Sequence, residues 1–241
     1  MEYAIEVSGL SKAYGGRRAV DGLSFCVPRG TVFGLLGANG AGKSTTIDCM
    51  LGTKRMDAGR VRILGMDPVR ERRALFERVG VQFQEGDYPK DILVGEFCEE
   101  TACLYRRAKN WRALLEQFGI GGREKQRVQS LSGGERQRLF IVLALIPGPQ
   151  AVILDELTTG LDARARRDVW SRLGALKAQG MTLLLTSHFM DEVEALCDGI
   201  CILKRGVPVF RGTVEEAKAR CGCARFEDAY LMLSDEREGR G

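Results

Sequence analysis

Residues 37–44 have the spacing of a loop that binds the phosphates of a nucleotide. Their order, Gly-Ala-Asn-Gly-Ala-Gly-Lys-Ser, fits the pattern G-x-x-x-x-G-K-[ST]. In such a loop, consecutive backbone N–H groups surround the anion, the lysine reaches the terminal phosphates, and the hydroxyl binds Mg²⁺. We therefore expect Lys43 to bind the β- and γ-phosphates and Ser44 to bind the metal. Further nucleotide contacts are expected from Gly37, Asn39, Gly40, Ala41, Gly42 and Thr45.

Asp155 and Glu156 follow the apolar run of residues 151–154, which predicts a buried strand. Ligands bind at the carboxyl ends of the strands in open parallel sheets, so both acids are placed to act on the nucleotide. This is the Walker B pattern: Asp155 would hold the magnesium, and Glu156 would orient or deprotonate the attacking water. The alternative, two acids that simply end a strand, is the less favoured interpretation, and the phosphate loop argues further against it.

A second phosphate binder is predicted at Leu131-Ser132-Gly133-Gly134-Glu135, which opens a helix. The N–H groups of a first helical turn lack intrahelical partners and attract anions. A helix N-cap would explain Ser132 alone. It would not explain two glycines inside the helix, because each costs about 1 kcal/mol relative to alanine; close approach of a ligand would. The spacing from Ser132 to Asp155 leaves room for one helix and a turn, which predicts that the two phosphate binders lie on opposite sides of one subunit.

Together, these motifs resemble the ATP-binding cassette (ABC) family, in which the nucleotide lies between one subunit's P-loop and the partner subunit's signature sequence. The resemblance implies that residues 131–135 act on the partner's nucleotide. It also implies that Gln84 contacts magnesium or water, that His188 contacts the γ-phosphate, and that Tyr14 stacks on adenine. Leu161 and Asp162 correspond to the D-loop, which crosses the dimer interface.

Several of these residues could instead have a structural role without any contact to the nucleotide. His188 is the only histidine of the chain, and alone it would be read as a surface or core residue. Tyr14 could pack on the sheet. Gln82 competes with Gln84, but strand alternation places residues 79, 81 and 83 on one face, which leaves Gln84 as the first residue free of the ladder. Two departures from the family pattern, Leu157 for proline and Thr159 for serine, remove no catalytic group.

The elements that must position these residues suggest three segments. Strands are expected at residues 3–7, 20–27, 31–36, 61–64 and 79–83, with a helix at 43–51. Helices at 95–107, 110–118 and 133–145 predict a helical insert. Alternation then resumes with strands at 151–154, 182–186 and 200–203 and helices at 163–179 and 190–197, followed by a helical tail at 213–236. The predicted fold is an α/β P-loop NTPase with a mainly parallel core sheet, an N-terminal antiparallel β subdomain and an inserted helical subdomain. We expect one domain over 1–241: core and β subdomain at 1–83 and 147–212, the insert at 84–146, and the tail at 213–241.

Composition excludes several other classes. A chain of 241 residues with 44% apolar residues can bury a core, and its net charge of +4 is spread over scattered basic residues, which argues against nucleic-acid binding. The start of the chain carries acid where a secretory signal carries base, and residues 139–146, the longest apolar stretch, fall far short of the ~20 needed to span a membrane. We expect a cytosolic protein with reduced, mostly buried thiols at its eight cysteines.

The family resemblance implies an ATPase that uses ATP and Mg²⁺ and dimerises around two ATP, most simply as a homodimer. It also implies a separately encoded membrane permease, which the chain binds on the cytoplasmic face of the membrane. The sequences around Gln84 and at residues 226–233 resemble those of bacterial drug- or antibiotic-exporting ABC-2 systems. Residues 88–94 would contact the permease, although Ile92, Val94 and Phe97 could instead belong to the core of the insert, the preferred interpretation for Phe97. Two rivals remain: a non-transport ABC ATPase acting on a soluble or ribosomal partner, and a monomeric P-loop kinase.

Overall fold

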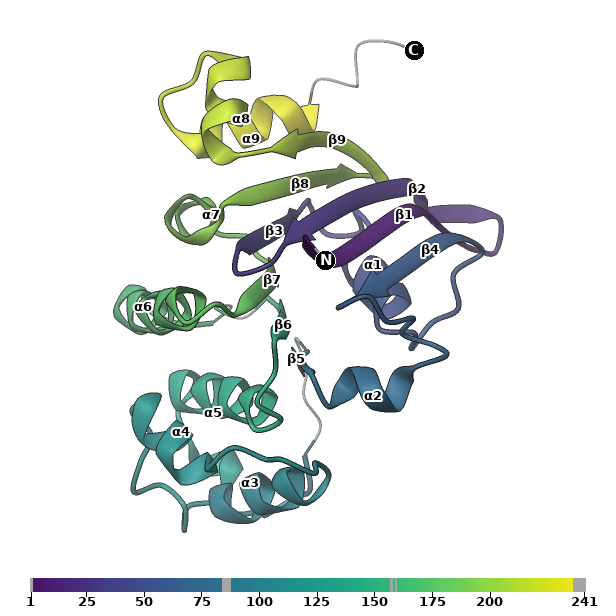
Figure 1. Ribbon diagram of the computed structural model, residues 1–241. Helices are drawn as coiled ribbons and strands as arrows, with labels where there is room; N and C mark the ends of the chain where they lie inside the picture. The colour runs from purple at the N-terminus through teal and green to yellow at the C-terminus, as the bar shows by residue number, and fades with distance from the viewer. Residues whose placement is uncertain (1, 84–87, 157, 159, 236–241) are drawn as a thin grey trace.

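The computed structural model describes residues 2–83, 88–156, 158 and 160–235, and it contains two sheets (Figure 1). The larger sheet has six strands in the order β5-β6-β7-β3-β8-β9. Its strands are β3 (Val32–Leu36), β5 (Val79–Gln82), β6 (Ala151–Asp155), β7 (Thr182–Thr186), β8 (Gly199–Lys204) and β9 (Val207–Gly212). All neighbouring pairs are parallel except β8 with β9. Because the strands from β5 to β8 run the same way, their carboxyl ends meet at one edge of the sheet.

The smaller sheet is antiparallel and is built from the first part of the chain. It pairs β1 (Tyr3–Tyr14) with β2 (Arg17–Pro28) on one side and with β4 (Ala58–Ile63) on the other. Alternate apolar residues of these strands are buried in a cluster shared with the helix α1 (Lys43–Met50) and with one face of the larger sheet. The phosphate loop joins β3 to α1 and therefore lies between the two sheets.

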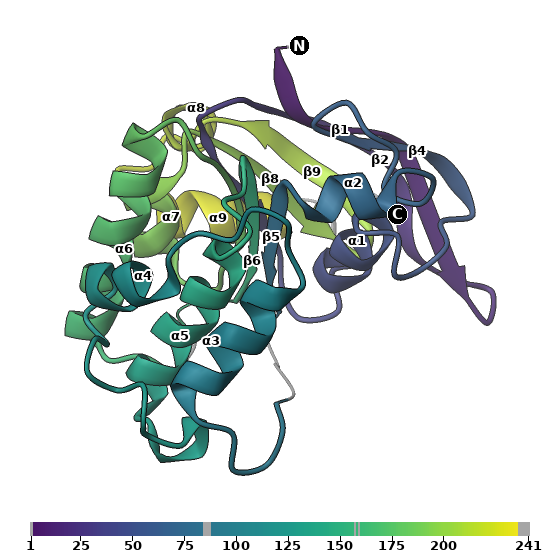
Figure 2. The ribbon, with the colours of Figure 1, turned by 60° about the horizontal axis from the view of Figure 1, so that its bottom comes forward.

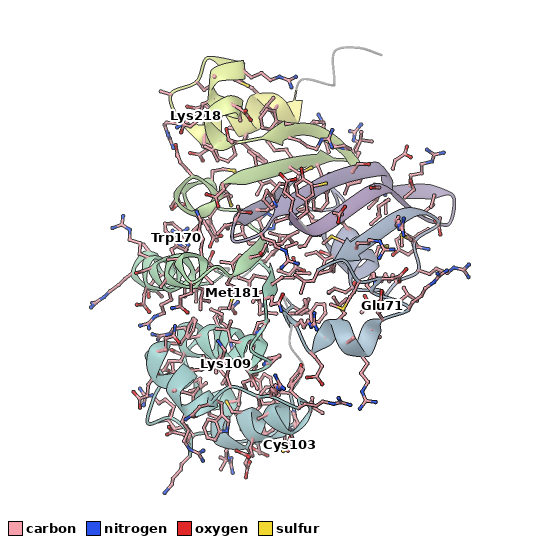
Figure 3. The ribbon with its side chains drawn as sticks, viewed as in Figure 1. Glu71, Cys103, Lys109, Trp170, Met181 and Lys218 are labelled. Carbon is pink, nitrogen blue, oxygen red and sulfur yellow. The ribbon has the colours of Figure 1, made fainter. Side chains whose placement is uncertain are left out.

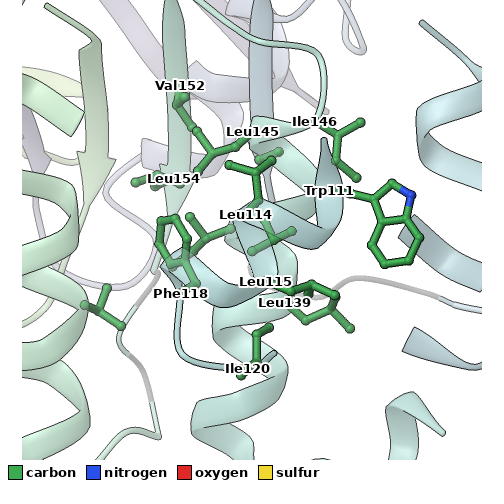
Figure 4. Close-up of a cluster of buried hydrophobic side chains, with 14 of the residues drawn as sticks. Trp111, Leu114, Leu115, Phe118, Ile120, Leu139, Leu145, Ile146, Val152 and Leu154 are labelled. Carbon is green, nitrogen blue, oxygen red and sulfur yellow. The ribbon is translucent and has the colours of Figure 1, made fainter. Parts of the chain in front are cut away.

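The helical insert contains α3 (Val94–Cys103), α4 (Trp111–Gln117), the short 3₁₀ helix η1 (Val128–Ser130) and α5 (Gly133–Leu145). Figures 1 and 2 show α3, α4 and α5 gathered away from the antiparallel sheet. Their apolar side chains form one core with the larger sheet, because Trp111, Phe118 and Leu139 belong to the same buried cluster as Val152 and Leu154 (Figure 4). Burial of the insert against the sheet fixes the direction of α5.

The apolar residues expected either to face a permease or to fill the insert are mostly internal. Ile92 and Val94 are buried, and Phe97 packs against the same cluster while remaining partly exposed. The core interpretation therefore holds for all three, most completely for Val94.

The remaining helices pack along the larger sheet, including its edge at β8 and β9. They are α2 (Arg72–Phe76), α6 (Ala163–Ala178), α7 (Met190–Leu196), α8 (Val214–Cys221) and α9 (Phe226–Asp235). The predicted tail is thus two helices, because Gly222 caps α8 with a left-handed backbone (φ 66°) that ends the first one. Phe226, Ala229 and Leu233 of α9 are buried in a third cluster with β8 and β9.

Several expected boundaries were wrong. The helix expected at 95–107 ends at Cys103, so the basic residues that follow lie in a connection. The strand expected to reach residue 83 ends at Gln82, and Phe83 is 43% exposed, so Phe83 does not share the buried face on which the assignment of Gln84 rested. Three elements of the described residues were not predicted: α2, η1 and β9. The strand β9 returns along β8 through a turn at Arg205 and Gly206, both with positive φ.

The cysteines match the expectation only in part. All eight are free thiols, but Cys26 and Cys103 are exposed, and Cys49, Cys98 and Cys201 are the fully buried ones.

Candidate nucleotide-binding and hydrolysis site

The phosphate loop is held in shape by its own lysine. Lys43 Nζ donates to the carbonyl oxygens of Gly37 (2.7 Å) and Ala38 (3.3 Å), across the loop from α1. Burial lowers the pKa of Lys43, while the nearby carboxylates of Glu156 and Asp155 act in the opposite direction. The ammonium therefore lies close to both acids, at the start of α1, where the helix dipole also favours an anion.

Two glycines of the loop are required by backbone contacts. A Cβ on Gly37, whose φ is 149°, would lie 2.5 Å from the Leu203 carbonyl oxygen of β8. A Cβ on Gly42, whose φ is 105°, would lie 2.4 Å from the Ala19 carbonyl oxygen of β2. Backbone atoms of neighbouring strands cannot move aside as a flexible side chain can, so both positions exclude a side chain. The loop is thereby clamped between the two sheets.

A pocket of about 620 Å³ opens beside the loop. Its lining includes eight residues that the sequence predicted: Tyr14, Asn39, Gly40, Gly42, Lys43, Ser44, Thr45 and Glu156. Tyr14 is 45% exposed, with the ammonium groups of Lys12 and Lys54 5.4 Å and 5.9 Å from its ring centroid. The ring of Tyr14 is thus accessible to a ligand. If Tyr14 only packed on the sheet, this exposure would have no explanation.

The pocket also contains residues that sequence reasoning missed. Arg17, Arg18, Ala19 and Arg205 line it. Arg17 and Arg18 directly follow the hairpin turn after Tyr14, so a basic pair next to the predicted adenine-stacking residue was the available signal. Arg205 comes from the unpredicted β8–β9 turn, and only the folded chain brings that turn to the loop.

Asp155 and Glu156 both depend on Thr186, which ends the neighbouring strand β7. Thr186 Oγ1 donates to Asp155 Oδ1 (2.5 Å) and accepts from the backbone N–H of Glu156 (2.9 Å). Glu156 has φ 51°, a left-handed backbone that is unusual without glycine, and this hydrogen bond helps to hold it. Glu156 Oε1 is in turn hydrogen-bonded to Nε2 of His188. The structure therefore brings Asp155, Glu156 and His188 together at the carboxyl ends of two adjacent strands.

The oxygen atoms near Lys43 suit a magnesium ion. The carboxylate of Asp155 is 6% exposed, and burial raises its pKa, with the Thr186 hydrogen bond opposing the rise. Its second oxygen accepts no hydrogen bond from a described residue. Ser44 supplies a hydroxyl to the pocket beside the loop, which Lys43 and Glu156 also line. A carboxylate and a hydroxyl are ligands that Mg²⁺ prefers, so this donor set fits the metal.

A buried carboxylate that the sequence did not single out supports His188. Glu192 of α7 is 1% exposed and accepts hydrogen bonds from Trp170 Nε1 of α6 (2.8 Å) and from the hydroxyl of Ser187. Ser187 directly precedes His188, so Glu192 ties the histidine segment to α6. Burial raises the pKa of Glu192, with the Ser187 and Trp170 hydrogen bonds acting the other way.

The predicted signature forms the first turn of α5. Ser132 is the N-cap in a capping box with Glu135: Ser132 N donates to Glu135 Oε2 (3.0 Å), and Glu135 N donates to Ser132 Oγ (3.3 Å). These bonds, with help from Arg123, hold the pKa of Glu135 below its usual value. Leu131 is buried, whereas Ser132 and Gly133 are exposed, and none of residues 131–135 lines the pocket of their own chain.

The predicted D-loop lies beside this turn. Asp162 caps α6 by accepting from Ala165 N (2.8 Å), and a Cβ on Gly134 would meet a methyl carbon of Leu161 at 3.7 Å. Among the predicted site residues, Gln84 lies outside the described residues, as do Leu157 and Thr159.

Comparison with known proteins decides the family. Residues 20–159 match the family model described as ABC transporter. The chain belongs to the ABC transporter family. It is 42% identical over 220 residues to Nod factor export ATP-binding protein I of Paraburkholderia xenovorans (strain LB400), covering 88% of this chain and 71% of that protein. It is 38% identical over 243 residues to the daunorubicin/doxorubicin resistance ATP-binding protein DrrA of Streptomyces peucetius, covering 97% and 74%.

Solved structures agree with this assignment. The structure of an ATP binding subunit of an ABC transporter superposes with a TM-score of 0.88 at 27% identity, covering 96% of this chain and all of that one. The ADP conformation of MJ1267, an ATP-binding cassette of an ABC transporter, superposes with a TM-score of 0.77 at 25% identity, covering 98% and 96%. This chain is therefore an ATP-binding subunit of an ABC transporter, and its enzymatic activity is ATP hydrolysis. The kinase alternative and the non-transport alternative are not supported. Across the described residues, no helix has the length and apolar character to cross a membrane.

Proposed function

We propose that this chain is the ATPase of an exporter whose permease is a separate polypeptide. The named relatives support this, since one is called a Nod factor export protein and the other a daunorubicin/doxorubicin resistance protein. The cargo of this transporter is a drug-like or other hydrophobic compound. The chain binds its permease on the cytoplasmic face of the membrane, and residues 1–241 act as one ATPase domain with the insert at 84–146 and the tail at 213–241.

Two copies of the chain close around two ATP molecules. The observation that carries this proposal is the separation of the P-loop pocket from the first turn of α5, whose residues do not line it. The N–H groups of Gly133 and Gly134 have no acceptor among the described residues, so they are available to a partner's γ-phosphate. Since ADP lacks that phosphate, ATP favours the closed dimer more than ADP does.

Hydrolysis is assigned to Glu156 at the end of β6 and to His188 after the end of β7. Glu156 orients and deprotonates the attacking water, and His188, bonded to Glu156, contacts the γ-phosphate. Tyr14 stacks on the adenine, and Lys43 moves from the loop carbonyls to the β- and γ-phosphates. Ser44, Asp155 and Gln84 would hold Mg²⁺, partly through water, and the metal would neutralise charge on the phosphates. Leu161 and Asp162 contact the partner at the dimer interface.

A pair of variants tests this scheme. Glu156→Gln retains an oxygen for the His188 bond but cannot take a proton, so we expect ATP binding without turnover and a stable dimer by light scattering with ATP and Mg²⁺. Lys43→Ala should lose nucleotide binding and remain monomeric under the same conditions. If the Glu156→Gln protein stays monomeric with ATP and Mg²⁺, even with its permease present, the closure scheme is wrong.

A further inference from the structure

A second large pocket lies at the amino ends of β5 and β6, on the side of the sheet opposite the nucleotide pocket. Its lining includes Arg78, directly before β5, and Gln150, directly before β6. The nucleotide pocket lies at the carboxyl ends of the same parallel sheet, and a five-residue strand such as β6 spans about 16 Å. The second pocket is therefore separate from the ATP site.

This pocket is strongly basic. It has a volume of about 940 Å³, and its lining includes five cations: Arg73, Arg78, Arg106, Arg107 and Lys109. We call this site the basic pocket. Among the described residues that line it, Glu77 is the one acid, which leaves an excess of four positive charges. The fold thus brings five cations together at one site, although the basic residues are scattered along the sequence.

The five cations are not compensated within the described part of the chain. None of them forms an ion pair with a described residue, whereas lysines elsewhere do, such as Lys12 with Asp57 (2.9 Å) and Lys177 with Asp198 (2.6 Å). The nearest acid, Glu77, contacts Arg106 only through the backbone N–H (3.4 Å). Concentrating like charges costs free energy unless an anion binds among them.

The walls of the basic pocket are held by backbone hydrogen bonds. Lys109 N donates to Ile146 O (2.8 Å), which joins the α3–α4 connection to the end of α5. Gln150 N donates to Arg78 O (2.8 Å), which joins the segment before β6 to the segment before β5. Cys103 and Lys109, which bracket the α3–α4 connection, are labelled in Figure 3. The cations therefore project from a preformed frame and not from a free tail.

A second hollow adjoins the basic pocket and shares Arg73, Glu77 and Arg106 with it, and its lining also includes the apolar side chains of Phe76 and Leu104. Leu104 lies in this hollow with Phe76 and is 75% exposed, the highest value among the large hydrophobic residues that the structure describes. Arginine suits phosphate because its planar guanidinium donates two parallel hydrogen bonds. A ligand that satisfies both parts of this surface carries phosphate at one end and hydrocarbon at the other.

We propose that the basic pocket binds the headgroup of an anionic phospholipid, with Leu104 and Phe76 against its apolar part. The pocket volume is within the range of small-ligand sites, and a basic cluster beside exposed apolar side chains is a common means of binding an anionic membrane surface. This contact is made by the ATPase subunit itself and adds to its attachment through the permease. It requires neither nucleotide binding nor dimerisation.

The test is co-sedimentation of the full chain with vesicles of phosphatidylcholine alone or with added phosphatidylglycerol, without nucleotide. We expect binding only to the anionic vesicles, weakening as salt is raised. Arg106→Gln combined with Arg107→Gln should lower the affinity roughly 25-fold, since each cation near an anionic surface contributes about five-fold. Leu104→Ser should weaken binding further. The matched control, Arg55→Gln with Arg60→Gln, removes the same charge at exposed positions near β4 and should bind almost as well as the unmodified chain.

Thermal melting and basal ATPase activity should be unchanged in the Arg106/Arg107 variant, which separates this proposal from the proposed function. Equal binding to both kinds of vesicle, or an equal loss in the two double variants, would overturn the assignment. A chain that binds a hexaglutamate peptide at the basic pocket but does not bind anionic vesicles would also overturn the assignment. The ligand of the pocket would then be an acidic polypeptide.

Discussion

Gly133 allows the structural and functional costs of a side chain to be separated. It is the first residue of α5, it is exposed, and a Cβ added to it would meet no atom within 4 Å in its own chain. Its φ is not in the left-handed region, so alanine fits the existing backbone. Glycine in a helix costs about 0.5–1 kcal/mol relative to alanine, and the lower value suits a terminal turn. We therefore expect Gly133→Ala to raise the free energy of unfolding by about 0.5 kcal/mol, or Tm by about 1–2 °C for a chain of this size.

The same change should reduce ATP hydrolysis. A phosphate bound by the first turn of α5 must come within hydrogen-bonding distance of the backbone, about 2.9 Å from the nitrogen, and a methyl group beside that path hinders it. Hydrogen bonds to charged groups contribute about 1.5–3 kcal/mol, so loss of one predicts a roughly 10- to 100-fold lower turnover at saturating ATP. We therefore expect Gly133→Ala to have a higher Tm and a lower rate of ATP hydrolysis than the unmodified chain.

Gly174→Ala is the matched control. Gly174 lies inside α6, and a Cβ there would also meet nothing within 4 Å. We expect a gain of about 1 kcal/mol from helix propensity with unchanged turnover. Circular dichroism melts and a phosphate-release assay on the three proteins measure both effects. If Gly133→Ala hydrolyses ATP at the wild-type rate, a phosphate does not approach the backbone closely at this glycine. If the variant has a lowered Tm, alanine does not fit the backbone conformation of residue 133.

Three further changes test other parts of the structure. Gly80→Ala would place a Cβ 2.0 Å from the Ala144 carbonyl oxygen of α5; we expect a loss of about 1–3 kcal/mol in urea unfolding, and a neutral result would mean that β5 and α5 are farther apart. Burial raises the pKa of Glu192 above the usual 4.5, so the folded state retains a proton that the unfolded state releases, and the contribution of this group to stability is lost as pH rises from 4.5 through the raised value. Glu192→Gln removes this dependence, so its stability relative to wild type should improve as pH rises across that window; a difference independent of pH would contradict it. Burial raises the pKa values of Cys98 and Cys201 to about 12, so iodoacetamide at pH 8 should label exposed Cys103 well before either, as measured by mass spectrometry of the native protein; equal labelling would show that these thiols are not protected.

The local motifs could be read from the sequence because their chemistry depends on consecutive residues. The phosphate loop, the cap at Ser132 and the acids at the end of β6 each occupy one short turn at the end of a strand or the start of a helix. Both predicted phosphate-binding turns begin a helix where they were expected. Element ends were predicted less well. The helix that stops at Cys103 and the strand that stops at Gln82 end where pairing and burial stop, and neither has a strong local signal.

The sequence by itself determined the family, the order of most of the elements and eight of the residues that line the nucleotide pocket, since these follow from contiguous patterns and hydrophobic period. Only the tertiary structure hydrogen-bonded Thr186 to both Asp155 and Glu156, joined Glu192 to Trp170 and brought Arg205 to the loop. It also assembled the basic pocket from α2 and three connections. These groupings depend on which strands become neighbours in the sheet. That choice is set by burial of the insert and helices over the whole molecule, and so no short stretch of sequence contains it.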